Sequence, residues 1–269
     1  MPAIQLSRLR DVLGQLFSLI DRPEQFHRAL ADFLEQQADH AYRAGENIPT
    51  RPRTPAYHIP PLVIRQLELE FTDACKRQPD ALFPIADHLW QDPHLELRHL
   101  AAHILGQMPS SHLQGVVDRL RTWALTCDDR SALNPLLERA TVSLRRDSPL
   151  EMVALLEGWL QGTDTLHLRI GLRVIEWLVQ DSQFENLPAL FRLLGPLVKK
   201  PTTPIFNNLA RALQAVARRS GGETTFFLRQ MLASSSNPST ARLARQVLPE
   251  LSESQQQTLR ASLRNQNPL

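Results

Sequence analysis

The amino-acid sequence repeats itself at an interval that few folds can accommodate. Arg98, Arg169 and Arg242 each follow a turn rich in Asp, Asn or Pro, and they lie 71 and 73 residues apart. Weaker copies fall midway, in CDDRSALNPLLERATVSL and PTTPIFNNLARALQAVA, so the basic period is roughly 36 residues. A helix, a turn and a second helix recurring at this interval are typical of stacked helix pairs. The repeat therefore predicts a HEAT-like α-solenoid.

The composition also favours helices over strands. The 269 residues include 46 Leu but only 21 Val and Ile together, and β-branched residues are enriched in strands. We expect an all-α fold, an α–α superhelix of about five to six HEAT-like helix pairs with an N-terminal helical extension. Residues 1–47 are predicted to form the extension and residues 62–269 the solenoid. Residues 48–61 contain five prolines and are expected to form an extended linker or arm.

Charge is unevenly distributed along the chain. From Arg192 to the C-terminus, eleven basic and only three acidic residues give a net charge of +8. Because the whole chain carries +2, residues 1–191 carry −6. A basic segment of this kind favours a polyanionic partner for the C-terminal part of the molecule.

The remaining composition excludes several classes of protein. The two cysteines lie far apart in the sequence, so neither a disulfide framework nor a thiolate zinc site organises the fold. No stretch approaches the roughly 18 consecutive apolar residues of a membrane span. The N-terminal residues also lack the pattern of a signal peptide. We therefore expect a cytoplasmic protein with no membrane partner.

Arginines are the strongest candidates for a binding surface. Arg98, Arg169 and Arg242 occupy equivalent places in their repeats, so they are expected to form a ladder suited to a phosphate backbone. The alternative is that they pair with acids of the neighbouring turns, such as Asp92 and Asp164. A second set, with no acids apparent nearby, is also expected to contact a polyanion: Arg173, Arg211, Arg218, Arg219 and Arg245.

Few residues suggest catalysis. Asp128 and Asp129 are adjacent in a turn between helices, where a carboxylate can act as a general base or, more often, cap the next helix. His99 and His103 lie one helical turn apart but lack the Glu of a zincin motif, so we expect no metal. Four tryptophans are expected to pack between helix pairs rather than to stack on a ligand: Trp90, Trp123, Trp159 and Trp177.

Three stretches carry a resemblance to a known family. They are YHIPPLVIR (residues 57–65), ADHLWQDPHLELRHLAAHIL, and WLQGTDTLHLRIGLRVIEWL. The chain resembles the bacterial HEAT-like-repeat DNA alkylation repair family, the alkylpurine DNA glycosylases. The first stretch is similar to that family's element before its first repeats, and the second to its next helix pair. The third resembles a later pair that presents an arginine to DNA, and Arg169 matches that arginine. The resemblance covers most of residues 40–250.

The resemblance implies that the chain grips double-stranded DNA, alkylated or not, on a basic concave face, with no metal or organic cofactor. Family catalysis uses an Asp held among tryptophans. The corresponding stretch here, TCDDRSALNP, has no Trp, and the place of the acid falls on Asn134, Ala132 or one of Asp128 and Asp129. Ala215 stands where the family has a further Trp. These departures argue against glycosylase activity but not against backbone binding, which needs only shape and positive charge.

The sequence thus favours a DNA-binding protein and leaves open whether it is an enzyme. One alternative is a HEAT scaffold that holds a protein partner, which exposed apolar residues in the groove would favour. In another alternative the protein is an active glycosylase, with Asp128 or Asp129 as the catalytic carboxylate.

Overall fold

The computed structural model describes residues 6–38, 54–127 and 129–265. Within these ranges the regular elements are all helical and no strand occurs, so the predicted all-α class is confirmed. The chain divides into two compact units, Met1–Asp147 and Ser148–Leu269.

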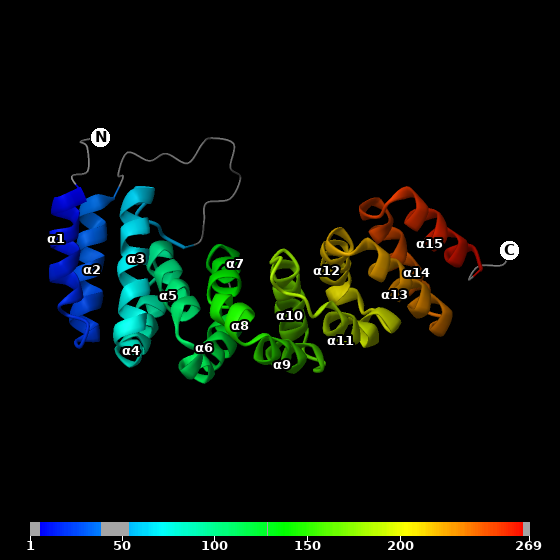
Figure 1. Ribbon diagram of the computed structural model, residues 1–269, viewed down its shortest axis with the longest axis horizontal. Helices are drawn as coiled ribbons and strands as arrows, with labels where there is room; N and C mark the ends of the chain where they lie inside the picture. The colour runs from blue at the N-terminus through cyan, green and yellow to red at the C-terminus, as the bar shows by residue number, and fades with distance from the viewer. Residues whose placement is uncertain (1–5, 39–53, 128, 266–269) are drawn as a thin grey trace. The chain divides into compact units, whose positions relative to one another are not determined.

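The first unit consists of short helices that pack on one another. Its elements are α1 (Leu6–Phe17), α2 (Pro23–Gln37), α3 (Pro61–Arg77), α4 (Pro79–Gln91), α5 (Leu95–Gln107), η1 (Ser110–His112), α6 (Leu113–Thr126), α7 (Arg130–Arg139) and α8 (Val142–Asp147). Helices α3, α5 and α7 contact one another in succession, and α2 and α4 contact each other (Figure 1). Helix α4 also contacts α3 and α5, which joins the two layers.

Apolar side chains spaced three or four residues apart form the core of this unit. Phe26 of α2 and Phe71 of α3 are fully buried. The ring of Phe17 lies 5.3 Å from that of Phe26 and 4.9 Å from that of Phe71, both edge-on. Edge-to-face contacts at these distances are favourable, so this cluster ties the first three helices together.

The second unit repeats the same kind of packing. Its elements are α9 (Pro149–Leu160), α10 (Thr165–Leu178), α11 (Leu187–Lys199), η2 (Thr203–Ile205), α12 (Phe206–Arg219), α13 (Gly221–Ser234), α14 (Pro238–Val247), η3 (Leu248–Glu250) and α15 (Glu253–Asn265). Helices α9, α11, α13 and α15 contact in succession, as do α10, α12 and α14 (Figure 1). Two of the three repeat arginines lie near helix starts in this unit, Arg169 on α10 and Arg242 on α14, and the third, Arg98, lies near the start of α5 in the first unit.

Candidate nucleic-acid interface

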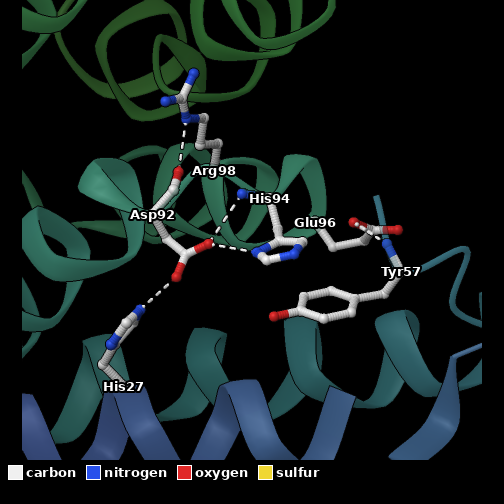
Figure 2. Close-up of polar contacts among 6 residues, drawn as sticks. All are labelled: His27, Tyr57, Asp92, His94, Glu96 and Arg98. Carbon is white, nitrogen blue, oxygen red and sulfur yellow. Dashed lines mark hydrogen bonds and ion pairs between the residues drawn. The ribbon is translucent and has the colours of Figure 1, made fainter. Parts of the chain in front are cut away.

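Arg98 lies in the first turn of α5, where its guanidinium points away from the carboxylate of Asp92 (Figure 2). Its Nε donates a hydrogen bond to the backbone carbonyl of Asp92 at 2.8 Å, and its Cζ lies 5.6 Å from the centre of the Trp90 ring. Among the described residues, no carboxylate oxygen lies within 4.0 Å of this guanidinium. The predicted alternative, an ion pair with Asp92, does not form.

The carboxylate of Asp92 is held by two histidines instead (Figure 2). Its Oδ2 lies 2.8 Å from Nε2 of His27, which comes from α2. Its Oδ1 accepts a hydrogen bond from the His94 backbone N–H at 2.9 Å and lies 2.8 Å from Nδ1 of the same residue. Burial opposes the charge of Asp92, but the hydrogen bonds from His94 and His27 outweigh it and lower the pKa of the carboxyl. The turn before α5 is thereby fixed to α2.

The described end of the proline-rich stretch, Thr54–Pro60, packs across the start of α5. The Tyr57 ring stacks on His94 with 4.0 Å between ring centres, and burial, helped by nearby carboxylates, raises the pKa of this tyrosine to about 12. The Glu96 carboxylate accepts the backbone N–H of Tyr57 at 3.0 Å (Figure 2). It also accepts the backbone N–H of His58 at 2.8 Å. The rest of the proline-rich stretch lies outside the described residues.

Asp129 caps helix α7, as the sequence favoured. Its Oδ1 accepts the Ser131 backbone N–H at 2.9 Å, and the Thr54 hydroxyl donates to its Oδ2. Burial opposes the charge of Asp129, but the hydrogen bonds from Ser131 and Thr54 outweigh it, with a smaller contribution from the Arg98 charge, and lower the pKa of the carboxyl. Both carboxylate oxygens therefore have partners. The other candidate carboxylate, Asp128, lies outside the described residues.

Trp90 and Trp123 stack on each other at the ends of α4 and α6. Their ring centres are 4.8 Å apart with an interplanar angle of 4°, and they are 8% and 6% exposed. The predicted packing role of these two rings is confirmed. Because each ring covers a face of the other, and Arg98 lies over Trp90, the pair does not form an open aromatic wall.

In the second unit, Arg169 lies near the start of α10 and also binds a backbone carbonyl. Its Nε and Nη2 donate to Pro204 O at 3.2 and 3.0 Å. Asp164 serves as the N-cap of α10, accepting the backbone N–H groups of Leu166 at 2.8 Å and His167 at 3.0 Å. The alternative ion pair between Arg169 and Asp164 therefore does not form.

Arg242 lies near the start of α14, with its Cζ 4.8 Å from the centre of the Phe206 ring. Like Arg98 and Arg169, it has no carboxylate of the described residues within 4.0 Å. A carbonyl or an aromatic ring orients a guanidinium without cancelling its charge. Each of these arginines therefore keeps a net positive charge at its helix start.

The second predicted set of arginines has more acidic neighbours than expected. Nη1 of Arg173 lies 2.6 Å from Glu176, Nε of Arg211 lies 3.8 Å from the same carboxylate, and Nη1 of Arg218 lies 3.0 Å from Glu250. The expectation that these three lack nearby acids was wrong. Glu176 follows Arg173 by one helical turn on the same helix, and Glu250 reaches Arg218 only because η3 packs on α12.

The two other members of that set differ from these three. Nη2 of Arg219 donates to the backbone carbonyl of Ser182 at 2.9 Å, which leaves its charge uncompensated. Arg245, on α14, is exposed and lines a cavity in the second unit. Within the described part of the chain, neither arginine has a carboxylate within 4.0 Å.

A family model described as DNA alkylation repair enzyme matches residues 34–254. The chain belongs to this family. The match runs from α2 to beyond η3, so it includes parts of both units and every arginine discussed above. No curated protein sequence matches the chain. The resemblance seen in the three sequence stretches is therefore confirmed, and membership in this family indicates a role related to DNA repair.

The histidine pair of α5 makes backbone contacts in this family member. Nε2 of His99 lies 3.2 Å from Ser131 O, and Nε2 of His103 lies 2.9 Å from Glu68 O. Burial lowers the pKa of both imidazoles. The described residues contain no cluster of three or more His, Cys, Asp or Glu that could hold a metal ion. No helix among them is long and apolar enough to cross a membrane.

Proposed function

We propose that this DNA alkylation repair family member binds the backbone of double-stranded DNA through arginines at its helix starts. The observation that carries the proposal is the state of Arg98, Arg169 and Arg242. They are oriented by carbonyl groups or an aromatic ring, and no described carboxylate lies within 4.0 Å of them. A guanidinium that is held in place but still charged suits phosphate, because each contact releases counterions from the DNA.

The scaffold proposed for this surface is a HEAT-like solenoid formed by residues 62–269. It would be preceded by a helical extension over residues 1–47 and a linker over residues 48–61. The succession of contacts from α10 to α12 to α14 supports this proposal, because stacked helix pairs present equivalent side chains at regular intervals. The basic segment from Arg192 onward supports it as well, because its net charge of +8 favours a polyanion.

The second set of arginines divides into those with and those without a carboxylate within ion-pair distance, and those without one are the stronger candidates for binding DNA. Arg219 and Arg245 have no described carboxylate partner, so they join the proposed DNA-binding surface. Arg173, Arg211 and Arg218 share their charge with Glu176 or Glu250. An arginine that must release an acid before it binds phosphate contributes less to affinity, so we assign these three a secondary role.

We infer that Asp129 serves the fold rather than base removal. Both of its carboxylate oxygens are engaged, by Ser131 and Thr54. Trp90 and Trp123 stack on each other and so leave no open aromatic wall for a cationic base. A general base must reach the group on which it acts, and here the hydrogen bonds to Asp129 would first have to break. The proposed function is therefore DNA binding without excision through Asp129.

A protein-binding scaffold has less support. The large apolar side chains that are most exposed come singly or in pairs from separate helices: Val12, Leu62, Leu69, Leu150, Leu166 and Phe226. Scattered apolar residues of this kind are normal on a soluble protein and do not indicate a docking surface.

Fluorescence anisotropy with a labelled blunt duplex tests the proposed binding. At about 50 mM salt we expect Arg98→Gln, Arg169→Gln and Arg242→Gln each to weaken binding by about fivefold. Arg146→Gln is the matched control, because Asp147 already neutralises that arginine at 2.8 Å, and it should leave the affinity unchanged. Wild-type affinity in all three variants would contradict the proposal. Thermal unfolding of each variant checks that the fold is retained.

Base release from alkylated DNA tests the assignment of Asp129. We expect no release of 7-methylguanine or 3-methyladenine that depends on this carboxylate. If the wild-type protein releases either base and Asp129→Asn abolishes that release, then the assignment is wrong and the enzyme alternative is correct.

A further inference from the structure

A cavity of about 950 Å³ lies in the second unit, between α13, the turn that follows it, α14 and α15. Its size is within the roughly 300–1,000 Å³ typical of ligand sites. We call it the α13–α15 pocket, and the residues that line it include Phe226, Arg229, Ser234, Ser236, Arg245 and Ser262. None of its lining residues is acidic.

The pocket combines positive charge with an exposed aromatic ring. Arg229 and Arg245 come from different helices, and neither has a described carboxylate within 4.0 Å. The Phe226 side chain, one turn before Arg229 on α13, is 67% exposed. Uncompensated guanidinium groups beside an exposed aromatic side chain are the combination that single-stranded nucleic-acid sites use, with bases on the ring and phosphates on the cations.

The turn that forms one wall is held in place before any ligand arrives. The Ser235 hydroxyl donates to the Lys199 carbonyl of α11 at 3.1 Å, and the Thr240 hydroxyl donates to the Val198 carbonyl at 2.8 Å. The Asn237 side chain accepts the Ser239 backbone N–H at 2.9 Å. A wall fixed in this way loses little conformational freedom when a ligand binds.

A second basic cavity adjoins the first. It measures about 570 Å³ and shares Gln230 of α13 with the α13–α15 pocket. Lys199 and Lys200 line it beside the Phe191 and Phe227 rings, and no acidic residue does. Positive charge therefore continues around α13, which suits a chain of phosphates better than a single small anion.

We propose that the α13–α15 pocket binds an unpaired stretch of the DNA to which the protein is bound. Phe226 stacks on a base, while Arg229 and Arg245 contact the flanking phosphates. Serine hydroxyls at the rim offer neutral hydrogen bonds to the same backbone. The inference rests on the proposed DNA binding and extends it, because it names an additional site and the single-stranded form of the ligand. Arg245, which also belongs to the proposed duplex surface, joins the two.

Fluorescence anisotropy with the full chain tests this site. The probes are a blunt duplex, the same duplex with a single-stranded extension of about six nucleotides at its 5′ or 3′ end, and the extension strand alone. We expect at least one extended duplex to bind about tenfold more tightly than the blunt one. Phe226→Ala and Arg229→Gln should remove most of that gain and leave blunt-duplex affinity unchanged.

Two substitutions in the same unit serve as controls. Leu150→Ala removes another exposed apolar side chain, and Arg260→Gln removes an exposed arginine whose Nη2 donates to the Gln256 side chain at 3.0 Å. Neither residue lines the pocket, so neither change should affect the gain.

The outcomes separate this inference from the proposed function. If the blunt duplex binds but the extensions add nothing, or if Phe226→Ala and Arg229→Gln retain the full gain, then the pocket assignment is wrong while duplex binding stands. If no duplex binds, the proposed function fails. In that case, binding of the extension strand that both pocket variants abolish would still support the pocket, and no binding of that strand would overturn it.

Discussion

Asp129 illustrates how one carboxylate can be either a catalyst or a helix cap. Its contacts with Ser131 and Thr54 favour the cap. We predict that Asp129→Ala lowers the free energy of unfolding by about 1 kcal/mol, the usual effect of losing an N-cap. Asp129→Asn should stay close to wild type, because an amide oxygen can still accept the Ser131 N–H. Urea denaturation measures both. Equal stability of Asp129→Ala and the wild-type protein would contradict the capping role.

Asp92 makes the stability of the first unit depend on pH. Its pKa is lowered in the folded protein, so its contribution is present above the pKa of the unfolded chain and is lost as the pH falls through the folded value. We predict that the urea midpoint falls as the pH drops below about 4, the ordinary pKa of an unfolded Asp, and that Asp92→Asn makes this fall shallower. Parallel curves for the two proteins would show that Asp92 contributes nothing to acid stability.

Sequence alone predicts residue roles where the relevant contacts are local. The cap at Asp129 and the packing of Trp90 could be predicted because both depend on position within a helix and its turn. The Thr54 contact with Asp129 joins residues 75 positions apart, and no local pattern signals it. The ion pair between Arg173 and Glu176 is a local contact that the sequence analysis missed. Its spacing of three residues on one helix was visible in the sequence.

At the scale of elements, two helical glycines differ in how closely the neighbouring helices approach them. A Cβ added at Gly106 of α5 would overlap the carbonyl oxygen of Arg139 at the end of α7, whereas one at Gly158 of α9 would meet nothing within 4 Å. We predict that Gly106→Ala destabilises the protein by about 2 kcal/mol, because backbone atoms have to move. Gly158→Ala should stabilise it by roughly 0.5–1 kcal/mol through helix propensity.

Denaturant midpoints of the two alanine variants measure this contrast. Unchanged stability of Gly106→Ala would contradict the close approach of α5 and α7, and a loss of stability in Gly158→Ala would contradict the open surroundings of that glycine. The control is matched in chemistry, since both changes replace a helical glycine with alanine and differ only in what surrounds the new methyl group.

The helices themselves follow closely from the sequence, while the path of the connecting segment does not. Turn residues ahead of α5, α10 and α14 mark helix starts, and the structure begins those helices at Leu95, Thr165 and Pro238. The segment Thr54–Pro60 was expected to be extended because of its prolines. Its position across α5 depends on Glu96 and His94, which are long-range partners that periodicity does not specify.

At the scale of the whole molecule, charge carries most of the functional information. The sequence predicts the basic C-terminal part and the family resemblance, and the family match over residues 34–254 confirms the latter. The sequence does not show which arginines form ion pairs with acidic residues. Glu250, for example, lies 32 positions from Arg218 in the sequence, but its carboxylate lies 3.0 Å from the Arg218 guanidinium. The structure therefore narrows the candidate surface to arginines that a carboxylate does not neutralise.

The salt dependence of duplex binding tests the central claim most directly. For the wild-type protein, anisotropy at about 50 and 200 mM salt should show affinity falling by about 10³-fold or more, which corresponds to at least about six phosphate contacts. Replacing Arg98, Arg169 and Arg242 together with Gln should reduce the slope of log affinity against log salt by roughly 2.7, about 0.9 for each lost contact. An unchanged slope in this variant, or no wild-type binding at low salt, would contradict DNA binding through these arginines.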